Sequence, residues 1–229
     1  MKNSTAILIP ARGGSKGIKN KNLKNFNKKP LIFWTIKQAI QSKFSSDIYV
    51  TSDSNSILNF SKKIGVKTIK RPKSIAKDIS STEEAILHFL ENPNINYENI
   101  ILLQPTSPLR KIKDIDNAFD LFVQKKCNSL FSVSFFSDFT VWKALKNNIV
   151  PFSYNPNKRI IRQKDTKYFI ENGSIYIFKS SIIKKHMNRI DVNSFAIYKM
   201  NKLQFFEIDD IEDFKICEHI FKSRLYLKL

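Results

Sequence analysis

The chain has 229 residues, of which 42% are hydrophobic and 19 are Phe, so it can bury a sizeable core and is not globally disordered. Its length suits one domain spanning residues 1–229. A net charge of +19 raises nucleic acid, an anionic membrane or an acidic small molecule as partners. No run of five or six like charges occurs. We therefore expect neither nucleic acid nor membrane as a partner, and an acidic substrate remains.

The two cysteines and the start of the chain argue against further classes of protein. Cys127 and Cys217 lie far apart with no CxxC spacing, which argues against a zinc site and a disulfide framework. The first apolar residues are soon followed by Pro10 and Arg12, so no signal-peptide core is present. No apolar stretch approaches the roughly 20 residues of a membrane span. A cytoplasmic protein is expected.

Short runs rich in Ile and Val alternate with segments whose apolar residues recur every three or four positions, as in a helix. This alternation predicts an α/β fold with a mostly parallel, Rossmann-like sheet flanked by helices. Strands are expected at residues 6–9, 47–51, 66–69, 100–103, 130–135, 174–178 and 195–200. Helices are expected at 30–42, 56–64, 112–126, in a short segment after 178 and from about 211. Gly65 favours the end of one helix, and the capping box of Ser81 and Glu84 favours the start of another.

Two segments interrupt this alternation. Residues 11–29 are polar and are expected to form a long loop after the first strand. Residues 136–169 contain Pro151, Pro156 and several Asn, which predicts an excursion from the sheet. Such an excursion is a candidate arm for dimerisation.

The loop after the first strand carries the strongest local motif, Arg12-Gly13-Gly14-Ser15-Lys16-Gly17. Glycines let the backbone approach a ligand closely, and the two cations suit phosphate oxygens. The motif fits neither GxxxxGK[ST] nor GxGxxG. From these residues alone, a phosphate cradle and an ordinary glycine-rich surface loop both remain open.

Longer motifs resemble one family. Residues 9–17, continuing through 20–23 and 29–31, are similar to the opening of the acylneuraminate cytidylyltransferases, which include the CMP-sialic acid and CMP-legionaminic acid synthetases. Residues 102–110 (LLQPTSPLR) and 172–177 (NGSIYI) resemble their second and third hallmarks. Matching residues also occur at 70–72, Ala76, Asp78 and 80–82, so the resemblance covers essentially the whole chain. It implies a nucleotide-diphospho-sugar transferase fold and a homodimer.

The resemblance also implies roles for individual residues. Those expected to bind the nucleotide are Arg12, Gly13, Ser15, Lys16, Asn22, Arg71, Ser80, Ser81 and Thr82. Those expected to bind the sugar are Gln104, Arg162 and Asn172. The end of a central strand is where open α/β sheets hold ligands, as at Gln104, and a guanidinium such as that of Arg162 suits a carboxylate. Surface roles for Arg71, as a cap or ion pair, and for Arg162, as a solvated arm residue, remain open.

An acidic segment near the carboxyl end completes the expected site. The resemblance implies that Glu207 and Asp209 hold Mg²⁺, and alternation along an extended segment would point both side chains the same way. Glu207 departs from the family's usual Asp, so Asp209 is the preferred ligand. Asp210, Glu212 and Asp213 have a simpler explanation as the acidic first turn of the final helix.

The implied reaction transfers CMP from CTP to the anomeric hydroxyl of an acidic nine-carbon keto sugar, for cell-surface glycan synthesis. Arg12, Lys16 and Asp209 are the expected catalytic residues, because displacement at phosphorus needs alignment and charge neutralisation. None of the three histidines is expected to act as a base. Alternatives are another acceptor, such as a different keto sugar acid or a phosphonate, or a non-catalytic nucleotide- or RNA-binding protein. Ile190 and Asp191 replace aromatics typical of sialic-acid enzymes, so the sugar stays open.

Overall fold

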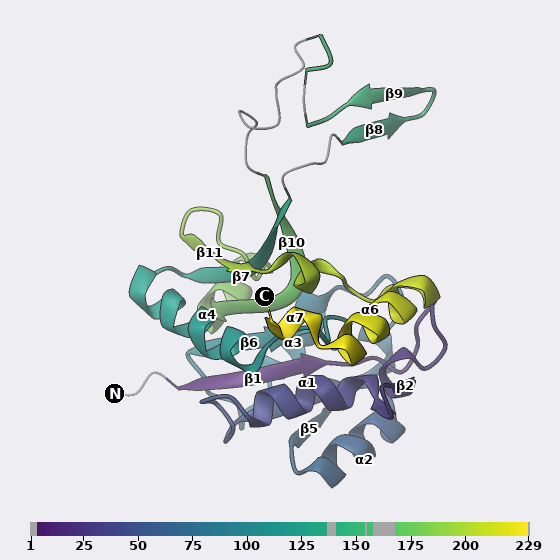
Figure 1. The fold of residues 1–229 in the computed structure, drawn as a ribbon. Helices are drawn as coiled ribbons and strands as arrows, with labels where there is room; N and C mark the ends of the chain where they lie inside the picture. Colours follow the sequence, from purple (N-terminus) through teal and green to yellow (C-terminus); the bar gives the residue numbers. More distant parts are fainter. Residues whose placement is uncertain (1–3, 137–140, 154, 158–167, 229) are drawn as a thin grey trace.

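The computed structural model describes residues 4–136, 141–153, 155–157 and 168–228. Its main feature is a seven-stranded sheet in the order β11-β7-β10-β6-β1-β4-β5 (Figure 1). Every neighbouring pair is parallel except those that β10 makes with β6 and β7. The strands are β1 (Thr5–Pro10), β4 (Ile48–Ser52), β5 (Lys67–Lys70), β6 (Asn99–Leu103), β7 (Ser129–Phe136), β10 (Tyr168–Lys179) and β11 (Phe195–Met200). All seven predicted strands and the mostly parallel α/β class are confirmed.

Helices cover both faces of this sheet. They are α1 (Leu31–Ile40), α2 (Asn55–Ile64), α3 (Thr82–Leu90), α4 (Ile112–Lys125), α5 (Ser180–His186), α6 (Ile211–Ser223) and α7 (Leu225–Lys228). Strand residues alternate between two cores, because Ile7 and Ile9 pack with α1, α2 and α4, whereas Ala6 and Leu8 pack with α3 and α5. Burial on both faces explains why the strands read as continuous apolar runs. No helix in the described ranges is long and apolar enough to cross a membrane.

The residues predicted to end one helix and to begin another have those roles in the structure. Gly65 ends α2 with a φ of 95°, a left-handed conformation that glycine adopts without strain. Ser81 and Glu84 form the capping box at the start of α3, with the Glu84 backbone N–H 3.1 Å from the Ser81 Oγ. Helix α1 begins one residue later than predicted, with Pro30 as its cap.

The loop predicted over residues 11–29 contains short regular elements that the sequence pattern did not predict. They are a 3-10 helix (Lys21–Leu23) and a small hairpin of β2 (Asn25–Phe26) and β3 (Lys29–Pro30). Asn27 and Lys28 both have positive φ at the hairpin turn. Phe26 is fully buried beside α6. A third apolar cluster thus anchors the loop, which local patterning cannot reveal.

The excursion begins where β7 and β10 run on beyond their predicted lengths. Tyr168 pairs with Phe136, and the ladder shifts register between Glu171 and Tyr176. The polar residues at 171–173 concealed this longer strand, because a bulge breaks the alternation there. Beyond it, β8 (Trp142–Leu145) and β9 (Asn148–Pro151) form a hairpin that stands apart from the sheet (Figure 1).

Two further 3-10 turns connect the main elements. The first (Lys73–Ile75) follows β5, and the second (Lys202–Phe205) follows β11. The second is capped by Asn201, whose Oδ1 accepts from the Gln204 backbone N–H at 3.2 Å. Because β5 and β11 run in the same direction as β1 and β6, both turns lie at the edge of the sheet where β1 and β6 end.

Candidate functional site

A cavity of about 340 Å³ lies at the carboxyl ends of β1 and β6. Pro10 ends β1 and Gln104 follows β6, and both line the cavity, as expected for a ligand site in an open α/β sheet. The structure brings together ten of the sequence-predicted site residues here. They are Arg12, Ser15, Asn22, Arg71, Ser80, Ser81, Thr82, Gln104, Glu207 and Asp209.

Three described site residues, Gly13, Lys16 and Asn172, do not line the cavity, and a fourth predicted residue is not among the described ones. The backbone N–H of Gly13 donates to the Asp53 Oδ1 at 2.8 Å. The Lys16 side chain is 78% exposed, with its Nζ 3.8 Å from the Asp78 Oδ2. Asn172 is buried within the sheet. Arg162 lies outside the described residues.

The glycine-rich loop is fixed by hydrogen bonds from three directions. Besides the contact of Gly13 with Asp53, the Asn22 Nδ2 donates to the Arg12 carbonyl at 3.0 Å. The Ala11 N–H donates to the Thr51 carbonyl, also at 3.0 Å. The loop also packs closely on the acidic segment, since a Cβ at Gly17 would collide with the Asp209 carbonyl oxygen. These contacts hold the backbone of the loop in place, while the side chain of Lys16 remains exposed.

The cations around the cavity differ in their partners. Arg12 pairs with Asp78 at 2.8 Å and also donates to the Lys77 carbonyl. Arg71 is 5% exposed, and its Nε has no hydrogen-bond partner among the described residues. Burial lowers the pKa of Arg71, while nearby Asp53 opposes that shift. Arg71 thus combines burial with a place on the cavity wall, which disfavours the surface roles left open for it.

Lys21 is a cavity residue that the sequence reasoning did not single out. Its Nζ donates to the Ile208 carbonyl at 2.8 Å and lies 3.7 Å from the Asp209 Oδ1. Its side chain is only 11% exposed. The residue lies within a segment that matched the family, at 20–23, so the signal was present. Its partner, however, comes from the far end of the chain.

The two predicted metal ligands have different surroundings. The side chains of Glu207 and Asp209 both line the cavity, while Ile208 between them is fully buried, as the alternation predicted. The Glu207 Oε1 accepts a hydrogen bond from the Thr106 Oγ1 at 2.8 Å. Burial raises the pKa of Glu207, and the Thr106 hydrogen bond opposes that shift. The Asp209 side chain is 82% exposed.

Gly173 gives Glu207 the space it occupies. Its φ is +62°, and a Cβ there would meet the Glu207 carboxylate. Neighbouring Asn172 is satisfied within the sheet, because its Oδ1 accepts from the Ser132 Oγ at 2.6 Å and its Nδ2 donates to the Ser134 Oγ at 3.1 Å. This segment therefore shapes the wall of the cavity from behind.

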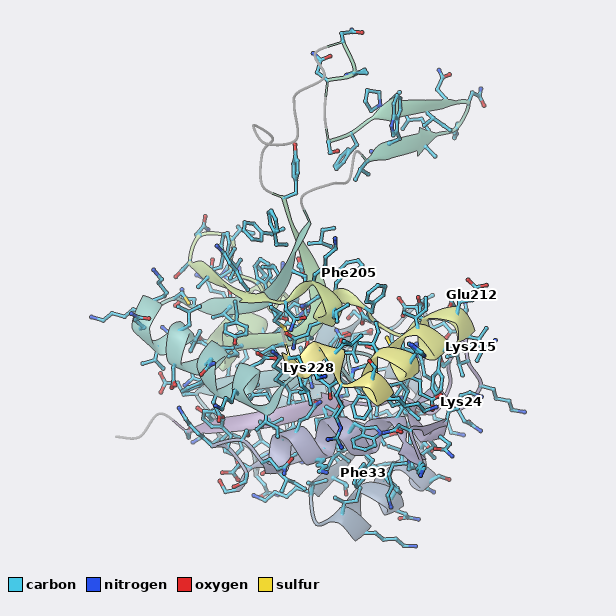
Figure 2. All side chains as sticks on the ribbon, in the orientation of Figure 1. Lys24, Phe33, Phe205, Glu212, Lys215 and Lys228 are labelled. Atoms are coloured by element: carbon cyan, nitrogen blue, oxygen red, sulfur yellow. The ribbon has the colours of Figure 1, made fainter. Side chains whose placement is uncertain are left out.

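The remaining acids begin the final helix, as predicted. Asp210 caps α6, accepting from the backbone N–H groups of Glu212 and Asp213. Glu212 and Lys215 are exposed and project from the outer side of α6 (Figure 2). Within the described part of the chain, no three His, Cys, Asp or Glu side chains come together as a metal-binding group. None of the histidines lines the cavity.

Comparisons with known proteins agree with this geometry. Post-translational flagellin modification protein B of Campylobacter coli is 30% identical, with 94% of each chain covered. Pseudaminic acid cytidylyltransferase of Campylobacter jejuni is 27% identical, covering 94% of this chain and 95% of that one. N-acylneuraminate cytidylyltransferase of Escherichia coli O18:K1:H7 is 31% identical over 95% of this chain, which spans about half (52%) of that enzyme's length.

Similarity of structure extends to more distant sequences. A CMP:2-keto-3-deoxy-manno-octonic acid synthetase complexed with CTP superposes with a TM-score of 0.74, at 15% identity, covering 97% of this chain and 100% of that one. At that identity the likeness establishes the fold. The sequence profile described as Cytidylyltransferase matches residues 6–228. The chain therefore belongs to the cytidylyltransferase family, and it is a nucleotidyltransferase.

Proposed function

We propose that this enzyme transfers CMP from CTP to the anomeric hydroxyl of a nonulosonic acid, an acidic nine-carbon keto sugar, and releases pyrophosphate. The observation that carries this proposal is the cavity at the ends of β1 and β6. It joins a glycine-rich loop and its cations on one side to Gln104 and two carboxylates on the other. Relatives named for N-acylneuraminate, pseudaminic acid and flagellin modification support the acceptor class and a role in glycan synthesis. We place the reaction in the cytoplasm, where CTP is available.

On the nucleotide side, the triphosphate would lie on the loop of Arg12 to Lys16. Arg12 and Lys16 both contact Asp78, an exposed arrangement that a phosphate can replace. The two cations would neutralise the charge that develops on the departing pyrophosphate. Arg71 and residues 80–82 line the adjoining wall, where buried N–H groups and small hydroxyls suit the polar edge of a cytosine.

On the acceptor side, Gln104 lines the cavity, and we propose that its amide contacts the sugar. Arg162, outside the described residues, is proposed to bind the sugar carboxylate through its guanidinium. For Asn172 we propose a supporting role, because its amide is already hydrogen-bonded to Ser132 and Ser134. These three residues would set where the anomeric hydroxyl meets the α-phosphate of CTP.

Mg²⁺ is the proposed cofactor, and the residues present fit it. Mg²⁺ prefers one or two carboxylates together with substrate phosphates and water. The exposed Asp209 carboxylate meets that need, and Glu207 lines the same cavity as a second oxygen donor. When bound, the ion supplies positive charge to phosphate oxygens. Asp209 is the residue we propose as its principal ligand.

We further propose that the β8–β9 hairpin is a dimerisation arm. Trp142 is 47% exposed and Ile149 70% exposed, and Figure 2 shows the hairpin side chains clear of the body. Trp142 pairs with Pro151 and Ile149 with Ala144, so the register places all four residues on one face of the hairpin. An apolar surface of this kind favours association. The double variant Trp142→Ser/Ile149→Ser is expected to shift the protein from dimer to monomer in sedimentation velocity. Val123→Ser, at an exposed site on α4, should not. A monomeric wild type would contradict the arm.

The function itself is tested by measuring pyrophosphate release from CTP with a panel of acceptors. The panel contains N-acetylneuraminic, legionaminic and pseudaminic acids, an eight-carbon keto sugar acid and a phosphonate. We expect turnover with at least one nine-carbon acid. Turnover with the eight-carbon acid or the phosphonate alone would replace the proposed acceptor with that compound and leave cytidylyl transfer in place.

A further inference from the structure

Arg110 is a buried cation directly behind the wall of the cavity. It is 1% exposed and is the largest fully buried side chain in the described chain. Its Nε donates to the Ser174 Oγ at 3.0 Å, and one terminal nitrogen donates to the Gln38 Oε1 at 3.0 Å. The other terminal nitrogen donates to two carbonyls, that of Gln104 at 3.1 Å and that of Ser174 at 2.6 Å. All of these acceptors are neutral.

This position is unfavourable for a charge. None of the ion pairs found among the described residues includes Arg110. Burial lowers the pKa of Arg110 to about 9, and the nearby charges of Asp114 and Glu207 oppose that shift. An apolar side chain of similar size would avoid the cost of a buried charge, but it would leave the carbonyls of Gln104 and Ser174 without this donor. The groups that Arg110 bonds therefore explain why an arginine stands here.

The hydrogen bonds of Arg110 connect the residue that follows β6 with the middle of β10, behind the cavity wall. Gln104 follows β6, and its side chain lines the cavity. Ser174 lies on β10 next to Gly173, the residue that faces the Glu207 carboxylate. The ladder between β10 and β7 shifts register between Glu171 and Tyr176, so regular pairing with β7 does not fix Ser174. The guanidinium supplies a fixed link across this irregular stretch.

We propose that Arg110 is a positioning residue for the acceptor substrate, holding Gln104 and the Gly173–Ser174 segment in the mutual geometry that binds the sugar. The planar guanidinium of Arg110 donates hydrogen bonds in three directions at fixed angles, and the ammonium group of a flexible Lys side chain cannot reproduce that arrangement. The nucleotide loop receives no hydrogen bond from Arg110, so CTP binding should not depend on it. This inference rests on the proposed transfer to a sugar acid.

The test compares Arg110→Lys and Arg110→Met with the wild type in steady-state kinetics and in direct CTP binding by calorimetry. We expect the acceptor KM to rise at least about tenfold in both variants, because small displacements of positioning groups are costly. The CTP dissociation constant should stay within about twofold of the wild-type value, since the residues that bind the nucleotide are unchanged. Gln38→Leu is the matched control on the side of α1, because it removes the bond from Arg110 and two bonds to the carbonyls of Pro108 and Arg110, but leaves the bonds of the guanidinium to Gln104 and Ser174 in place. It should lower the melting temperature and leave both constants unchanged.

The possible outcomes separate the two proposals. If wild-type enzyme turns over no sugar acid, the proposed function fails. If it does, and the Arg110 variants raise both constants equally or leave the acceptor KM unchanged, the positioning role is wrong. Should both Arg110 variants fail to fold, Ser174→Ala decides, because it removes only the hydroxyl that accepts from the Nε. A selective rise in its acceptor KM supports the inference, and an unchanged KM overturns it.

Discussion

The cations of the phosphate loop, Arg12 and Lys16, are at least partly exposed to solvent, whereas Arg110 behind the acceptor wall is buried. The side chains of Lys16, Arg12 and Asp78 are 78%, 33% and 37% exposed. Behind the acceptor wall, Arg110 is 1% exposed and fully hydrogen-bonded, and burial raises the pKa of Glu207. Exposed ion pairs rearrange at little cost, but buried networks do not. The nucleotide side can therefore exchange partners when CTP arrives, while the acceptor side is formed in advance.

The largest expected effect is the loss of activity in Arg12→Ala. Removing one cation that stabilises charge on the leaving pyrophosphate should lower kcat/KM by about 10²–10³-fold. Stability should change by less than about 0.5 kcal/mol, because the pair with Asp78 is partly solvated and lies at the surface of the cavity. Pyrophosphate release and thermal unfolding of the same preparation measure the two quantities.

Lys62→Ala provides the control for this variant, since Lys62 is an exposed cation in the last turn of α2, outside the cavity. It should leave kcat/KM unchanged. If Arg12→Ala lost stability as well as activity, the nucleotide side would resemble the acceptor side and the contrast between them would fail.

Next in size is the effect of Asp209→Asn, at the boundary between the two sides. Loss of an exposed carboxylate that binds Mg²⁺ should lower kcat about 10²-fold and raise the Mg²⁺ concentration needed for half-maximal rate. The measurement is a Mg²⁺ titration of pyrophosphate release. Glu212→Gln, an exposed acid three residues along, is the control and should titrate like the wild type (Figure 2). Full activity in Asp209→Asn would remove the metal assignment.

Sequence patterns predicted the sheet better than the contacts within the site. Strands buried on both faces are continuous Ile and Leu runs, so the pattern predicts β1 and β6 directly. The site residues at their ends came from the family resemblance, and the topology of open α/β sheets supported only the place of Gln104. Lys21 bonds to a carbonyl 187 positions away, and Arg110 to a hydroxyl 64 positions away. No local periodicity encodes such partners. The same limit applies to β10, whose register shift hides the strand's true start.

The smallest expected effect is a change in the melting temperature of a Glu207 variant. It measures what burying this carboxylate costs the folded protein, independently of activity. Because burial raises its folded-state pKa above the unfolded value, Glu207 contributes stability below the unfolded pKa, and that contribution is lost as pH rises through the folded pKa. An ionised Glu207 therefore costs stability near pH 7. Glu207→Gln removes the charge and retains an oxygen that can accept from Thr106. The variant should melt about 2–4 °C higher at pH 7, the shift that about 1 kcal/mol gives in a domain of this size.

That gain should disappear near pH 4, where the wild-type carboxyl is protonated in both states. Melting curves at the two pH values provide the measurement, with Glu91→Gln at an exposed position as control. A gain that persisted undiminished at pH 4 would mean that packing against Gly173, and not the buried charge, limits stability at this wall. Packing, and not a buried charge, would then fix the Glu207 side of the cavity. The buried charge of Arg110 would be left to carry the contrast with the solvated cations of the nucleotide side.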